Sequence, residues 1–192
     1  RVTIYDNIMV QHRLVTEELG VKRFALSVGW SMGAQQAYQW ACLFPDMVER
    51  LATLAGSARC AKHNFVFIEG VKAALTSNSE FNHGWYEKQP LIGLRAMGRV
   101  WAGWALSQTW YRNEMYKSLG YSSLDDFLIA YWDGIYLQRD PNDLLAMMDT
   151  WQQADISAND TFNGDFEKAL GAITAKTFVM PGQTDLYFPP ED

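Results

Sequence analysis

The pattern of apolar and polar residues predicts a helix near the start of the chain. Apolar positions at Ile8, Val15 and Leu19 are spaced by seven and then four residues, which places them on one face of a helix. Asp6 or Asn7 is a residue type that caps helix N-termini. We therefore expect a helix that begins at this cap and buries the three apolar side chains.

Short apolar runs on either side of a second helix predict parallel strands. The run at 24–28 shows no alternation of apolar and polar residues, which is typical of a strand buried on both faces. Residues 34–44 are helix formers followed by a proline, and 50–55 is a second apolar run. Strand, helix and strand form a βαβ unit, so the sequence predicts an α/β fold with a parallel sheet. Strand character returns at 176–180, after a short helix at 166–170.

The middle of the chain, from about 64 to 155, predicts helices and no strand. Ser122 and Ser123 each have an aspartate three residues later, a pattern that caps a helix, and Asp140 followed by Pro141 marks another helix start. We therefore expect an α/β core formed by 1–60 and 161–192, with 61–160 as a helical lid inserted between its strands.

Composition excludes several classes of protein. The chain has 16 basic and 22 acidic residues, so its net charge of −6 argues against binding to nucleic acid. No apolar stretch is long enough to span a membrane, and no signal-peptide pattern is present at the start. Cys42 and Cys60 are too few and too far apart for a disulfide scaffold or a metal site. We expect a cytoplasmic protein that binds no metal, nucleic acid or membrane.

The residues Gly-Trp-Ser-Met-Gly at 29–33 match the G-x-S-x-G nucleophile elbow. In such a turn a serine between a strand and a helix is held in a strained conformation with its hydroxyl exposed, which identifies Ser31 as the candidate nucleophile. We expect Gly29 and Gly33 to lie where the two backbones nearly touch. The N–H of Met32, at the positive end of the helix, is the candidate oxyanion donor.

An acid and a base would complete a catalytic triad. Asp185 lies in a Pro-Gly turn after the last predicted strand, and it follows Ser31 in the chain order expected for Ser, Asp and His. The three histidines, His12, His63 and His83, all precede Asp185, and we expect structural or surface roles for them. Without a general base the serine hydroxyl is a poor nucleophile, so we expect the chain by itself to be nearly inert.

Taken together, these motifs resemble the α/β-hydrolase superfamily and, within it, homoserine O-acetyltransferase-like proteins. The resemblance extends over nearly the whole chain. It rests on segments 19–23, 29–36, 44–48, 93–99, 139–142 and 181–190.

The resemblance implies a reaction and a substrate site. It implies transfer of an acetyl group from acetyl-CoA, a co-substrate rather than a bound cofactor, to the hydroxyl of homoserine through an acyl intermediate on Ser31. It assigns Arg99, in the lid, to the substrate carboxylate. Trp30 and Ala34 stand where family members carry glycine, and Leu106 stands near the place of an expected tyrosine. Partners would then be a small-molecule acyl donor and acceptor, and a homodimer is compatible with this interpretation.

The resemblance also implies that further strands precede the chain and that a loop bearing the catalytic histidine follows it. We therefore interpret the chain as a fragment with an incomplete α/β-hydrolase core. One sheet edge would be left open, and such an edge promotes aggregation, so poor solubility is expected.

Two other functions remain open. An esterase or thioesterase would use the same serine with water as acceptor. A binding protein derived from a hydrolase would have lost catalysis altogether. Product analysis with acetyl-CoA, with and without homoserine, separates the first two functions. The reading frame beyond Asp192 addresses the third, because a histidine encoded there supports an enzyme.

Overall fold

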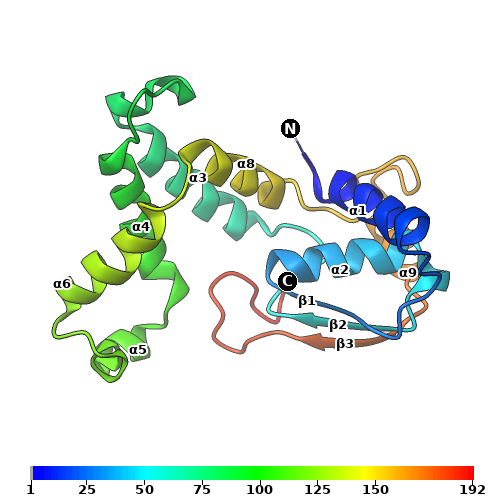
Figure 1. The fold of residues 1–192 in the computed structure, drawn as a ribbon. Coiled ribbons are helices and arrows are strands. Elements are labelled where there is room, and N and C mark those ends of the chain that lie inside the picture. Colours follow the sequence, from blue (N-terminus) through cyan, green and yellow to red (C-terminus); the bar gives the residue numbers. More distant parts are fainter. Residues whose placement is uncertain (1) are drawn as a thin grey trace. The chain divides into compact units, whose positions relative to one another are not determined.

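The structure is a computed structural model that describes residues 2–192, and the chain folds into two compact units. The core unit comprises the residues up to Asn64 together with Asp149–Asp192, and the helical unit is Phe65–Met148. Figure 1 shows a small sheet with helices in the core unit, and helices joined by loops in the helical unit. The predicted limits of core and lid, 1–60 with 161–192 and 61–160, stay predictions.

The core unit holds a parallel sheet in the order β1–β2–β3. The strands are β1 (Ser27–Trp30), β2 (Arg50–Leu54) and β3 (Lys176–Met180). The predicted strands at 50–55 and 176–180 are thus present. The first strand begins three residues later than predicted, because Phe24 makes only an isolated bridge to Val48.

Helices of the core unit pack on one face of this sheet (Figure 1). They are α1 (Ile4–Arg13), which continues into the π-helical turn η1 (Leu14–Glu18), then α2 (Met32–Leu43) and α9 (Phe166–Gly171). A 3₁₀ turn, η2 (Pro45–Met47), follows α2. Leu51 is fully buried, and the hydroxyl of Thr53 donates to the hydroxyl of Tyr38 in α2, so this face of β2 is covered.

The opposite face of the sheet contradicts the expectation that the first strand is buried on both sides. The strand register aligns Val28 with Ala52 and Phe178, and Trp30 with Leu54 and Met180, so these side chains share one face. Val28 is 62% exposed and Trp30 is 74% exposed. Within residues 2–192, no helix covers this face, although its side chains are as apolar as those of a buried strand.

The first helix also differs from its prediction. Thr3 caps α1, and its hydroxyl accepts from the backbone N–H of Asp6, whose carboxylate accepts from the backbone of Thr3 in return. Asp6 therefore lies inside the helix as the second half of a capping box. Ile8 is fully buried as expected, but Leu19 is 65% exposed because it follows the π-helical turn, which ends the regular spacing.

Two helices contain residues of both units, and the helical elements that lie between these two in the sequence belong to the helical unit. α3 (Lys62–Thr76) and α8 (Pro141–Gln152) each begin in one unit and end in the other. The helical unit also contains η3 (Ser79–Gly84), α4 (Leu91–Ala105), α5 (Gln108–Arg112), η4 (Met115–Leu119), α6 (Leu124–Phe127), η5 (Leu128–Asp133) and α7 (Gly134–Tyr136). The predicted helical character of the middle of the chain is confirmed.

Predicted helix starts in the helical unit are present. The hydroxyl of Ser123 accepts from the N–H of Asp126, and the carboxylate of Asp126 accepts from the backbone of Ser122. The carboxylate of Asp140 accepts from the N–H groups of Asn142 and Asp143 at the start of α8. These bonds satisfy N–H groups that have no partner within a helix.

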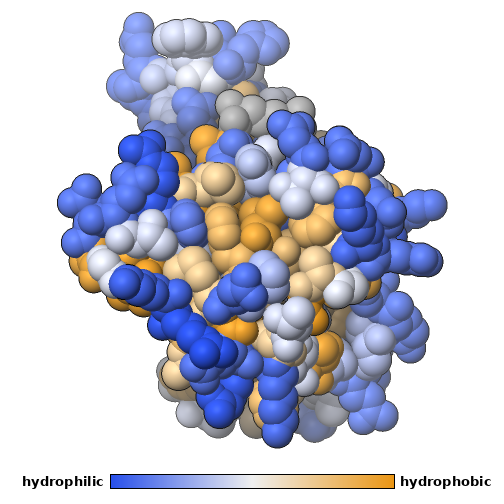
Figure 2. All heavy atoms as spheres, turned by 90° about the vertical axis from the view of Figure 1, so that its right-hand side faces the viewer, coloured by the Kyte–Doolittle hydropathy of each residue, from blue (hydrophilic) through white to orange (hydrophobic). Residues whose placement is uncertain are grey.

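The surface is mixed in character. Figure 2 shows apolar side chains grouped on one face and surrounded by hydrophilic ones. Among the exposed apolar residues of the core unit are Val10 and Leu14, which line a surface depression of about 220 Å³ together with charged residues. None of the helices formed by residues 2–192 combines the length and the apolar character needed to cross a membrane.

Candidate active site

Ser31 occupies a sharp, strained turn between β1 and α2. Its backbone has φ 56° and ψ −126°, a left-handed conformation that a residue with a side chain adopts only at a cost. The turn is held by hydrogen bonds on both sides. The N–H of Ser31 donates to the carbonyl of Leu54 at 3.0 Å, and the carbonyl of Ser31 accepts from the N–H of Ala34 at 2.9 Å. This is the geometry that a nucleophile elbow requires.

Glycines permit this turn, but only one of the two predicted positions needs one. A Cβ on Gly29 would lie 2.0 Å from the carbonyl oxygen of Gly33, so the backbones do touch there. The expected close approach of the two backbones is therefore present. A Cβ on Gly33 would meet nothing within 4 Å, so this position does not itself exclude a side chain.

A third glycine, which the motif does not include, also supports the elbow. A Cβ on Gly56 would lie 2.8 Å from the carbonyl oxygen of Ser31 and 2.4 Å from the Cβ of Ala34. In the sequence Gly56 is simply the residue after the predicted strand at 50–55. Its contact with the elbow depends on the pairing of β1 and β2, which a local motif does not contain.

The start of α2 lies directly after the serine. Met32 is the first residue of the helix, so no preceding helical carbonyl accepts its N–H. The helix has 12 residues, and its aligned peptide dipoles place partial positive charge at this end. The N–H of Met32 is thus available to stabilise negative charge that develops beside Ser31.

Asp185 lies in the loop that follows β3. One carboxylate oxygen, Oδ1, accepts from the N–H of Tyr187 at 2.8 Å and from that of Phe188 at 3.1 Å. These bonds fix the orientation of the carboxylate. The other oxygen, Oδ2, has no hydrogen-bond partner within residues 2–192, so it can accept a bond from a further group.

Ser31 and Asp185 lie at the same edge of the sheet. Trp30 pairs with Leu54, and Leu54 pairs with Met180, so β1 and β3 end at the same level with one strand between them. Two strand spacings amount to about 10 Å. Within the described residues no hydrogen bond joins Ser31 to Asp185, and a group bonded to both would have to lie between them.

The described histidines do not fill that position. His12 stacks on Phe44 with ring centroids 3.9 Å apart. Phe44 directly follows α2 and Ser31 directly precedes it, and 12 helical residues span about 18 Å, so His12 lies at the far end of this helix. His63 and His83 are exposed, and neither Ser31 nor Asp185 has a hydrogen bond or ion pair to a histidine among residues 2–192.

Other nucleophiles in the core unit are suppressed. Cys42 lies near the C-terminal end of α2 with its side chain buried, and this burial raises the pKa of its thiol to about 12. Burial and the nearby charge of Asp192 raise the pKa of the Cys60 thiol to about 11. Both side chains are therefore almost entirely protonated at neutral pH, and the protonated thiol is a weak nucleophile.

The described residues contain no group of three or more His, Cys, Asp or Glu that could hold a metal ion.

Arg99, the residue that the resemblance assigned to a substrate carboxylate, lies on α4 in the helical unit. Its Nε and one terminal nitrogen donate to the two carboxylate oxygens of Asp133 at 2.9 and 3.0 Å. The hydrogen bonds with Asp133 raise the pKa of the guanidinium, and the carboxylate of Asp133 is buried. The charge of Arg99 is thus already paired within its own unit.

The chain is similar to known ester hydrolases over its whole length. It is 39% identical over 193 residues to an ethyl acetate hydrolase of Pseudomonas veronii. The aligned region covers 100% of the chain and 55% of that protein. The crystal structure of an acetylester hydrolase from Corynebacterium glutamicum matches with a TM-score of 0.95 and 36% identity, again over 100% of the chain and 55% of that protein. The chain therefore spans about half the length of these relatives. No protein-family model matches it.

Similarity to homoserine acyltransferases is weaker. A homoserine O-acetyltransferase of Chloroherpeton thalassium is 25% identical over 195 residues, which are 99% of the chain and 50% of that protein. The narrower resemblance suggested by the sequence is therefore not the best fit. Trp30, Ala34 and Leu106, where the chain departs from the acyltransferase pattern, agree with this ranking.

Proposed function

We propose that this chain, which has the fold of the α/β-hydrolase superfamily and whose relatives are enzymes, carries the nucleophile and the acid of a carboxylester hydrolase. The observation that supports this proposal most strongly is the strained conformation of Ser31 at the end of β1, beside the free start of α2. The esterase function, which the sequence left open, replaces acyl transfer to homoserine as the main interpretation, because the ester hydrolase is more similar to the chain than the homoserine acyltransferase is.

In the proposed reaction Ser31 attacks the ester carbonyl. A general base accepts the hydroxyl proton as the bond from Oγ to the carbonyl carbon forms, and the N–H of Met32 stabilises the oxyanion. The alcohol leaves with that proton when the ester C–O bond breaks, which yields acyl-Ser31. Water then attacks the acyl group with help from the same base, and the carboxylic acid and free serine are released.

Asp185 would orient and stabilise the base. Its carboxylate is held by two backbone N–H groups and keeps Oδ2 available as an acceptor. A histidine bonded to Oδ2 on one side and to Ser31 on the other would complete the triad. Because none of the described histidines bonds to either residue, the proposal includes a histidine from outside the 192 residues.

The substrate proposed is a small, uncharged ester of acetic acid. The names of the similar hydrolases, which act on ethyl acetate or acetyl esters, support this choice. The pairing of Arg99 with Asp133 supports it as well, because recognition of an amino-acid carboxylate needs a cation that is not already paired. An uncharged ester requires no such cation.

The test measures acetate release from ethyl acetate by the purified chain and by any longer form that its reading frame encodes. We expect hydrolysis by a form that includes the base, its loss in Ser31→Ala, and its retention in the matched control Ser27→Ala. Formation of acetylhomoserine from acetyl-CoA and homoserine, at a rate above acetate release, would favour the acyltransferase. A folded form containing the base that shows neither reaction would favour a binding protein.

A further inference from the structure

Gln35, in the first turns of α2 behind the nucleophile, is buried without hydrogen-bond partners. Its side chain is 1% exposed, and neither Oε1 nor Nε2 has a partner within residues 2–192. Its backbone N–H donates to the carbonyl of Ser31 at 3.3 Å, so the residue belongs to the elbow itself. Long side chains in a helix lean toward its N-terminus, which directs the carboxamide toward the turn that begins at Ser31.

Neighbouring glutamines on the same helix show that partners are the norm here. Gln39, also 1% exposed, donates from Nε2 to the carbonyl of Ile156 at 3.1 Å. Gln36 accepts at Oε1 from Gln11, which in turn accepts from the indole N–H of Trp40. Gln35 is thus the exception among the three glutamines of α2.

We propose that the carboxamide of Gln35 anchors an enclosed water molecule behind the nucleophile elbow. A buried amide left without partners costs free energy, and buried polar groups are for this reason nearly always bonded to protein or to ordered water. Both polar atoms are already shielded from solvent by the described residues, so a partner arriving from outside would have to displace them. Water suits the position because it donates to Oε1 and accepts from Nε2.

This assignment gives Gln35 a structural role beside the turn that carries Ser31. The water would satisfy both polar atoms of a residue whose backbone N–H donates to the carbonyl of Ser31. The role is independent of the proposed esterase function, because it concerns how the turn is held and not what Ser31 reacts with.

The first test compares two substitutions by the apolar, similarly sized methionine. We expect Gln35→Met to lower the thermal midpoint by about 2–8 °C, since the water loses its anchor. Gln39→Met is the reference variant, in which the lost hydrogen-bond partner is known. It is expected to lower the midpoint as well, since it removes a hydrogen bond to Ile156. An unchanged or raised midpoint in Gln35→Met, with a lowered one in Gln39→Met, would overturn the proposal.

A second measurement does not depend on the stability of a variant. A high-resolution crystal structure of the unsubstituted protein should contain an ordered water within hydrogen-bond distance of both Oε1 and Nε2 of Gln35. A dry cavity, or a protein group bonded to the carboxamide in place of water, would overturn the proposal. Neither test requires catalytic activity, so their failure is distinguishable from failure of the esterase function.

Discussion

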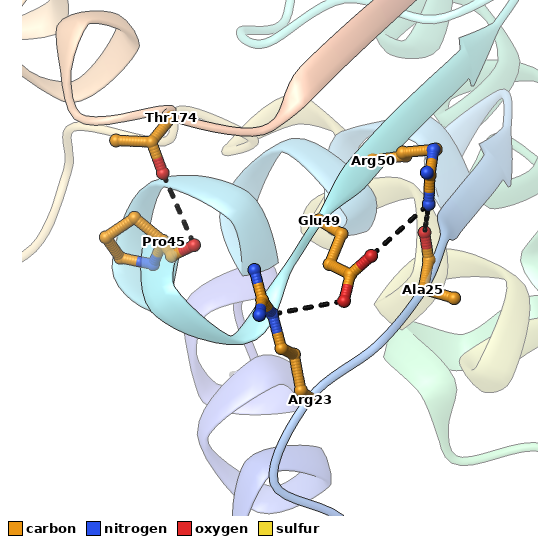
Figure 3. Close-up of polar contacts among 6 residues, drawn as sticks. All are labelled: Arg23, Ala25, Pro45, Glu49, Arg50 and Thr174. Carbon is orange, nitrogen blue, oxygen red and sulfur yellow. Dashed lines mark hydrogen bonds and ion pairs between the residues drawn. The ribbon is translucent and has the colours of Figure 1, made fainter.

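The two edges of the sheet in the core unit differ in their polar contacts. At the edge where the strands begin, charged side chains are paired with one another. At the edge where the strands end, the backbone is strained and side-chain oxygens lack hydrogen-bond partners. At the beginning, Glu49 bonds to Arg23 and Arg50, each at 3.3 Å, and Arg50 also donates to the carbonyl of Ala25 (Figure 3). The hydroxyl of Thr174 donates to the carbonyl of Pro45 beside them.

The opposite edge shows the reverse pattern. Ser31 and Ala55, which directly follow β1 and β2, have φ values of 56° and 44°. The hydroxyl of Ser31 and Oδ2 of Asp185 have no hydrogen-bond partner within residues 2–192. Strain and unused bonding capacity concentrate at functional sites, whereas satisfied ion pairs are typical of structural surfaces. This difference between the two edges supports placing the proposed reaction at the carboxyl edge of the sheet.

The largest effect below the loss of Ser31 itself is expected at Asp185. Asp185→Asn should lower kcat/KM for ethyl acetate by about 10³–10⁴-fold, because the amide no longer stabilises a protonated histidine. Asp160→Asn, an exposed position in the same unit, is the matched control and should leave the rate unchanged. Steady-state kinetics measure both. A loss of less than tenfold in Asp185→Asn would remove this residue from the triad.

The elbow can be tested by a pair of glycine substitutions. Gly29→Ala places a Cβ 2.0 Å from the carbonyl oxygen of Gly33, so we expect it to lower the free energy of unfolding by about 3 kcal/mol or more. Gly33→Ala adds a Cβ to open space within a helix and should be neutral or raise that free energy by up to about 1 kcal/mol. Denaturant titration measures both, and equal effects would contradict the described turn.

The smallest effect is expected at the edge where the strands begin. Glu49→Gln removes two ion pairs whose arginines are more than half exposed, so its cost should be no more than about 1 kcal/mol. The rate of ester hydrolysis should not change. Thermal unfolding and the kinetic assay check these expectations together. A large loss of activity in Glu49→Gln would end the distinction between the two edges.

Local patterns predicted much of the core unit. The strands at 50–55 and 176–180 are found within one residue of their predicted limits, and the turn at Ser31 was predicted because its strain is encoded in a five-residue motif. The predicted α/β-hydrolase fold is confirmed by the structural match to esterases. The strand limits and the turn at Ser31 depend on residues that are neighbours in the sequence.

Features that depend on distant contacts were not predicted. The need for glycine at Gly56 arises from the pairing of two strands, and the isolation of Gln35 arises from the packing around α2. The exposure of Val28 could not be derived from an apolar run, because a run shows that a strand can be buried and not what covers it. Arg99 was selected by resemblance, which gave no indication of its pairing with Asp133.

The central claim is that Ser31 is the nucleophile, and covalent trapping tests it most directly. A fluorophosphonate ester forms a bond from phosphorus to the attacking oxygen as fluoride leaves, and the adduct survives digestion with trypsin. In a form of the protein that hydrolyses ethyl acetate, we predict one adduct per chain, in the peptide between Arg23 and Arg50, with fragmentation placing it on Ser31 and not on Ser27. An adduct on any other residue, or full hydrolytic activity in a protein that takes up no label, would contradict the account.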